Sequence, residues 1–232
     1  MTDVAGATGG YVLAVLPLGS TEQHGPHLPF ETDTLLATAA AGVVADVPMG
    51  PDHVRVLPAL AYGASGEHQS FAGTVSMGTD ALAETILELG RSITTWAGRL
   101  VVINGHGGNV EALRRAVSRL RYEGRDCAWL SCRTAEFSTD THAGHAETSL
   151  MLHLYPELVR PDLARAGCTE PLVEILPAMR EGGVAAVSAT GVLGDPTTAT
   201  EADGTRLWEA LAADVRDRVG RWNPGGTDGM LA

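Results

Sequence analysis

Residues 11–16 read Tyr-Val-Leu-Ala-Val-Leu, a continuous apolar run with β-branched members. This pattern predicts a strand that is buried on both faces. Further apolar runs follow at residues 54–57, 100–103 and 127–132. Because helical patterns separate these runs, the sequence predicts an α/β fold with a mainly parallel sheet.

The predicted helices lie between and after these strands. One begins at Asp33, and another is amphipathic, with apolar residues spaced by four, three and four along one face. A capping box at residues 200–203 predicts the start of the last helix. Between residues 156 and 198 the pattern is irregular, with one strand predicted near 184–187. The predicted helices cover residues 33–47, 79–97, 110–122, 146–154 and 200–222.

The chain of 232 residues fits a single domain over residues 1–222, followed by a loose tail over 223–232. Its net charge of −12 argues against nucleic acid and anionic membrane surfaces as partners. All 16 basic residues are arginine, which excludes a lysine Schiff base. With three irregularly spaced cysteines and no basic, apolar leader, we expect a cytoplasmic location.

Polar side chains gather directly after three of the predicted strands, in residues 18–33, 104–109 and 142–149. In an open parallel sheet, ligands bind beyond the carboxyl ends of the strands. These three clusters are therefore expected to converge on one point. Imidazole and carboxylate groups without thiolate suit Zn, Mn or Fe(II).

The spacing of individual residues supports a metal site. Glu22 and His24 are two apart, so both side chains leave an extended segment on the same side. Asp33 stands at a helix start, where its two carboxylate oxygens could bridge two metal ions. His106 lies in a turn flanked by glycine. A structural role for a single loop histidine, and a plain glycine turn at residues 104–109, remain the alternatives.

Four segments of the chain, at residues 18–33, 66–74, 104–109 and 142–149, closely resemble the creatininase (creatinine amidohydrolase) family. The resemblance implies a three-layer αβα fold and a hydrolase that acts on amide bonds. It also implies two divalent ions, Fe(II), Zn or Mn. The ligands that it implies are Glu22, His24, Asp33 and His106, with Asp33 as the bridge.

Two positions depart from the creatinine-cleaving members of that family. Gly108 stands where the second metal ion would take a carboxylate, which makes Glu147 the candidate substitute. A carboxylate that stabilises its helix N-terminus, or an acid/base partner of His142, is the alternative for Glu147. Thr141 stands where those enzymes have a glutamate, which favours an amide other than creatinine.

The resemblance extends to residues that would act on the substrate. His142 resembles the catalytic histidine, which would give a proton to the leaving nitrogen, and Ser65 resembles a substrate-contacting position. Supporting roles are expected for His27, Glu67, His68 and His145.

Residues 62–68 and 191–196 resemble a peptidase branch of the family. That branch implies a modified precursor peptide as the substrate, cut near its C-terminus to release a Val-Tyr-derived fragment for a redox cofactor. A hydrolase of small cyclic amides or formamides, and a non-catalytic peptide-binding module, are the alternatives. The family also implies a closed homo-oligomer such as a hexamer.

Overall fold

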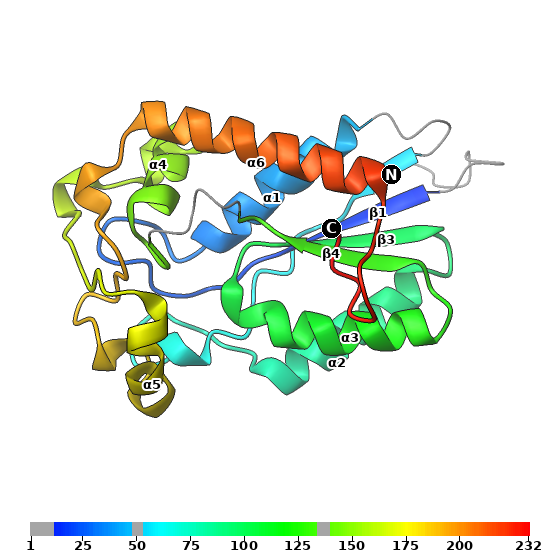
Figure 1. Ribbon diagram of the computed structural model, residues 1–232, viewed down its shortest axis with the longest axis horizontal. Helices are drawn as coiled ribbons and strands as arrows, with labels where there is room; N and C mark the ends of the chain where they lie inside the picture. The colour runs from blue at the N-terminus through cyan, green and yellow to red at the C-terminus, as the bar shows by residue number, and fades with distance from the viewer. Residues whose placement is uncertain (1–11, 48–52, 134–139) are drawn as a thin grey trace.

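The computed structural model describes residues 12–47, 53–133 and 140–232. Four parallel strands form the central sheet in the order β2-β1-β3-β4 (Figure 1). The four predicted strands are thereby confirmed, although Tyr11, the expected first residue, lies outside the described residues. The strands are β1 (Val12–Leu18), β2 (His53–Val56), β3 (Arg99–Asn104) and β4 (Cys127–Ser131).

Helices cover both faces of the sheet and make three layers, as predicted. In Figure 1, α1 (Thr32–Ala45) and α6 (Glu201–Arg221) lie above the sheet. Below it lie α2 (Thr79–Ile93) and α3 (Val110–Tyr122). None of the helices in the described part of the chain is long and apolar enough to cross a membrane.

Alternation along β1 divides the hydrophobic core in two. Leu13 and Val15 pack in the cluster that includes α1 and α6. Ala14 and Leu16 belong to the cluster on the α2 and α3 side. Successive side chains of a strand point to opposite faces, and every residue of β1 is buried. A continuous apolar run is therefore what this central position requires.

The last helix begins at the predicted cap. The Thr200 side-chain oxygen accepts a hydrogen bond from the backbone N–H of Asp203 at 3.0 Å. This bond satisfies one of the N–H groups that the first helical turn leaves without a partner. Trp222 ends the helix in the left-handed conformation, with φ of 41°.

Two segments between residues 156 and 198 differ from the prediction. Residues 184–187 were expected to form a strand, but Val184–Ala186 is a short 3₁₀ turn, η7. Helix α5 (Leu172–Gly182), which contains Pro177, is not predicted by the sequence pattern. Proline disfavours a helix interior because it removes a backbone donor and crowds the preceding turn. For that reason the sequence pattern appeared irregular here.

The prediction of a loose tail over residues 223–232 is wrong. Leu231 is fully buried, and its N–H donates to the Trp129 carbonyl at 2.9 Å. In return, the Trp129 N–H donates to the Gly229 carbonyl at 3.1 Å. The tail therefore covers the outer edge of β4, whose backbone groups would otherwise lack partners on that side. The packing of the tail depends on contacts between residues far apart in sequence, which a local sequence pattern does not contain.

The parallel sheet explains how the polar clusters meet. Leu18 of β1 is in register with Asn104 of β3, and Asn104 is in register with Ser131 of β4. The three strands thus end at the same level, and the loops that carry the polar clusters leave from one edge. Helix α4 (His145–Leu154) begins within the third cluster and packs against α6.

Candidate metal centre

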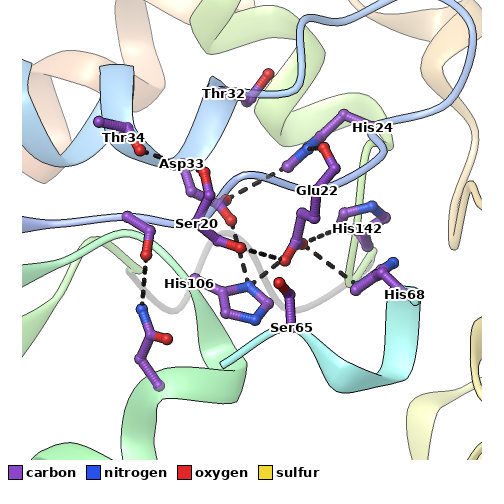
Figure 2. A network of polar contacts seen from close by, with 12 residues as sticks. Ser20, Glu22, His24, Thr32, Asp33, Thr34, Ser65, His68, His106 and His142 are labelled. Carbon is purple, nitrogen blue, oxygen red and sulfur yellow. Dashed lines mark hydrogen bonds and ion pairs between the residues drawn. The ribbon is translucent and has the colours of Figure 1, made fainter. Parts of the chain in front are cut away.

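The polar clusters converge as predicted. Figure 2 shows Glu22 and His24 from the loop after β1 facing Asp33 at the start of α1. His106, from the loop after β3, and His142, just before α4, complete the group. All five side chains are buried.

Asp33 lies between two imidazoles. Its Oδ1 is 3.3 Å from His24 Nε2, and its Oδ2 is 3.2 Å from His106 Nδ1. The two oxygens of one carboxylate therefore face two different halves of the cluster. A bridging ligand between two cations needs this arrangement.

Glu22 is held in place by a residue that the sequence analysis did not single out. Ser20 donates a hydrogen bond to Glu22 Oε2 at 2.7 Å. The other oxygen, Oε1, then faces the cluster and lies 3.3 Å from His106 Nδ1. Ser20 thereby fixes which carboxylate oxygen is presented to the centre.

Several buried atoms of the cluster fit a divalent cation. Glu22 Oε1, His24 Nε2 and Asp33 Oδ2 have no hydrogen-bond partner within the described residues. Leaving such buried atoms unpaired is costly unless an ion or water binds them. Among the described residues, three triads have donor atoms within 4.8 Å of one another: Glu22, Asp33 and His106; His24, His142 and Glu147; and Glu22, His68 and His142. Nitrogen and carboxylate oxygen are suitable donors for Zn, Mn and Fe(II).

The electrostatics of the cluster favour positive charge. Burial alone would lower the pKa of His24, but the nearby carboxylates, above all Asp33, raise this pKa to about 9. Against the same burial effect, Glu22 and Asp33 raise the pKa of His106 well above its usual value. Burial would raise the pKa of Asp33, yet the two imidazoles hold it below its usual value. The carboxylates thus create a negative site that stabilises a cation.

Glu147 lies close to the cluster but also has a local partner. Its Oε2 is 4.0 Å from His24 Nε2 and accepts a hydrogen bond from the Ala143 N–H at 2.6 Å. The first contact suits a metal ligand. The second suits a carboxylate that stabilises the start of α4. The metal-ligand and the helix-terminus interpretations of Glu147 therefore both agree with its position.

His142 turns its Nδ1 towards the centre. Its Nε2 lies 2.8 Å from the backbone carbonyl oxygen of Gln23, which can only accept, and 3.0 Å from the Gln23 side-chain nitrogen, which can only donate. The carbonyl contact is the shorter one and favours the tautomer with the proton on Nε2, which leaves a lone pair on Nδ1. Nδ1 lies 3.6 Å from Glu22 Oε1 and faces the cluster. Burial, followed by the charge of His24, lowers the pKa of His142. The imidazole is thus suited to accept a proton at Nδ1.

Gln23 is a second residue of the site that the sequence pattern does not predict. Its side-chain nitrogen lies 2.8 Å from His68 Nδ1 and donates to the Gly191 carbonyl at 3.1 Å. His68 Nε2 in turn lies 3.4 Å from Glu22 Oε1. Gly191 has φ of +80°, and a Cβ there would lie 1.9 Å from Gln23 Oε1. In an extended segment, the middle residue of Glu-x-His points away from its two neighbours. The spacing could therefore have indicated that Gln23 contacts other segments around the site, such as those of His68 and Gly191.

Glu67 occupies the space beside Gly108. A Cβ on Gly108 would lie 2.7 Å from Glu67 Oε1. The same oxygen is 3.4 Å from His106 Nε2, on the side of the ring opposite Nδ1. A carboxylate in this position orients the imidazole and makes it a better ligand. The supporting role expected for Glu67 agrees with this geometry.

The remaining residues predicted from the sequence, Ser65, His27 and His145, differ in their contacts. Ser65 is fully buried beside Glu22 in Figure 2, and its Oγ has no hydrogen-bond partner among the described residues. His27 Nε2 bonds to Thr148 Oγ1 at 2.9 Å. His145 bonds to Thr198 Oγ1 at 2.8 Å and is absent from all three candidate metal-binding triads of the described chain.

A cleft of about 340 Å³ opens over the centre. Its polar lining includes Asp33, Glu67, His68, His106, Arg133, Thr141, His142 and Glu147. Its apolar lining is formed by Leu172, Leu176, Met179 and Leu193. The cleft gives a substrate access to the buried cluster.

The fold and this cluster define a class of protein, the hydrolases that act on amide bonds and bind divalent metal ions. The family model described as creatininase, creatinine amidohydrolase, matches residues 1–219. The chain belongs to the creatininase family.

Individual relatives agree with this assignment. The mycofactocin precursor peptide peptidase of Mycobacterium tuberculosis H37Rv is 57% identical over 223 residues, which cover 94% of this chain and 88% of that protein. A solved creatininase structure with Mn is 30% identical, with a TM-score of 0.76, and the match covers 96% of this chain and 95% of that chain. A creatininase variant of the Zn-Zn type is 30% identical, with a TM-score of 0.74 and coverage of 94% and 92%.

Proposed function

We propose that the chain holds two divalent ions and hydrolyses an amide bond of a peptide. Glu22, Asp33 and His106 would hold one ion, and His24, Asp33 and Glu147 the other. The observation that carries this proposal is the position of Asp33, whose two oxygens face His24 and His106 separately.

The ions supply chemistry that the side chains lack. Two divalent cations lower the pKa of a shared water and polarise the carbonyl of a bound amide. The donor set accommodates Fe(II), Zn or Mn, since His and carboxylate sites discriminate weakly among them. Relatives with Mn and with a Zn-Zn centre support these candidates.

His142 is the proposed proton carrier. Its Nδ1 lone pair faces the cluster, so it can take a proton from the attacking water. The Nε2–H would keep donating its hydrogen bond to the Gln23 carbonyl, which keeps the ring oriented during the transfer. His142 Nδ1 would then deliver the proton to the leaving nitrogen, a role typically worth about 10²- to 10⁴-fold in rate.

The proposed substrate is the modified mycofactocin precursor peptide. Cleavage near its C-terminus would release a Val-Tyr-derived fragment for a redox cofactor. The 57% identical peptidase supports this assignment. The shape of the site also supports it, because a second hollow of about 440 Å³ continues past Glu67 along α5 to Arg180 and Gly183. A peptide chain needs such an extension, whereas a small cyclic amide does not.

The experiment compares substrates on protein loaded with Fe(II), Zn or Mn. The matured precursor peptide, the unmodified peptide, creatinine and a formamide are incubated separately, and products are identified by mass spectrometry. We expect cleavage of the matured peptide near its C-terminus and little turnover of creatinine. Preferred cleavage of creatinine or formamide would overturn the substrate. Peptide binding without cleavage would indicate a binding module.

A pair of histidine variants tests the proton carrier. We expect His142→Asn to lower kcat at least 100-fold while both metal ions remain bound. His145→Asn is the matched control, because this nearby histidine bonds to Thr198 instead of joining the cluster. Equal loss in both variants would contradict the role of His142.

Two expectations from the sequence stay predictions, the cytoplasmic location and the closed homo-oligomer. Exposed Phe30 and Leu158 border a groove of about 490 Å³ and offer apolar surface for a second copy. Light scattering at micromolar concentration should give the mass of an oligomer such as a hexamer. A monomeric mass would refute it.

A further inference from the structure

Helix α5 carries an apolar face that the main core does not use. Leu172, Leu176 and Met179 are spaced by four and three residues, so they share one side of the helix. Within α5 only Ile175 is buried, and it joins a small cluster with Val184 and Leu193. Figure 1 shows α5 away from the sheet, and the helix packs on the 3₁₀ turns η2 (Gly66–His68) and η7.

This face lines the same cleft as the metal-binding residues. The apolar wall continues to Leu193, whose N–H donates to the His142 carbonyl at 2.9 Å. The wall therefore starts beside the residue proposed to move the proton. A side chain that contacts this wall must belong to a residue close to the reacting bond.

We propose that Leu172, Leu176 and Met179 form a subsite for an apolar side chain that flanks the scissile amide. This inference rests on the proposed function and specifies one part of the substrate. Leu172 is 37% exposed, so its surface is open to a ligand. Burying apolar surface of the substrate against this face favours binding, whereas a polar side chain would lose hydrogen bonds to water there.

The test compares peptides on the metal-loaded protein. One peptide is the C-terminal segment of the precursor, and its analogues carry Ser in place of each apolar residue among the last four in turn. Replacing a buried Val-sized side chain by Ser should lower kcat/KM about 10-fold at the position that occupies the subsite.

Two variants of α5 show whether this preference comes from the proposed face. In Leu176→Ala we expect the apolar preference to fall from about 10-fold to about 3-fold or less, with kcat/KM for the Ser analogue nearly unchanged. Val173→Ala is the control, because Val173 is 74% exposed and does not line the cleft. This variant should keep the full preference. An unchanged preference in Leu176→Ala, or no preference in the unsubstituted protein, would overturn the subsite.

Binding measurements separate this inference from the proposed function. Fluorescence anisotropy with metal-loaded His142→Asn protein gives the Kd of each peptide when turnover is blocked. We expect the Ser analogue to bind with a Kd about 10-fold higher than that of the apolar peptide, and this ratio to fall when Leu176→Ala is added. That result would support the subsite even if the peptides were not cleaved. Absence of cleavage would then count against the proposed function alone, and equal Kd values for all peptides would count against the subsite.

Discussion

Replacing Asp33 by Asn tests the bridging carboxylate with little change in shape. Each Asp33 oxygen faces one imidazole of the cluster, at 3.2 and 3.3 Å. When each oxygen's contact with its ion is valued as one charge-assisted hydrogen bond, that contact contributes about 1.5–3 kcal/mol. Losing two such contacts predicts about 3–6 kcal/mol, or about 10²- to 10⁴-fold in the combined affinity for the two ions. Hydrolysis should fall with metal content.

The assay is metal content by plasma mass spectrometry after dialysis, followed by titration against a chelator of known affinity. Glu31→Gln is the matched control, because it removes a carboxylate two positions earlier, at the exposed start of α1. We expect about two ions per chain in the control and fewer than one in Asp33→Asn. Two ions bound to Asp33→Asn with unchanged affinity would refute the bridging role.

Three further predictions concern the rest of the structure. Glu147→Gln should lower metal content from about two ions towards one and turnover at least 100-fold. Full metal content with lost turnover would make Glu147 an acid/base group, and no change would leave it a helix-terminal carboxylate. Leu231→Ala should lower the free energy of unfolding in denaturant by about 2–5 kcal/mol, because Leu231 is fully buried, and a loss below about 1 kcal/mol would contradict this. Burial raises the pKa of Cys127 and Cys132 to about 12, so both should stay protonated at pH 8. A thiol reagent should then modify only the partly exposed Cys168 before denaturation and all three cysteines afterwards, and rapid native modification of Cys127 would contradict this.

Local sequence patterns determined the framework. The apolar run before Leu18 predicted a buried strand because side-chain alternation and burial are properties of a short segment. The carboxyl ends of parallel strands meet at one edge, so the sequence also predicted that Glu22, His24, Asp33, His106 and His142 would lie together.

The tertiary structure alone decided how these side chains face one another. Ser20 selects the Glu22 oxygen that points inward, and the Gln23 side chain reaches Gly191, 168 positions along the chain. Glu67 occupies the space beside Gly108, and the C-terminal residues cover the edge of β4. The last three arrangements depend on the distance between segments that are far apart in sequence, and the Ser20 contact depends on the exact backbone conformation of its loop. Composition and periodicity describe neighbouring residues, and for this reason they do not contain those distances.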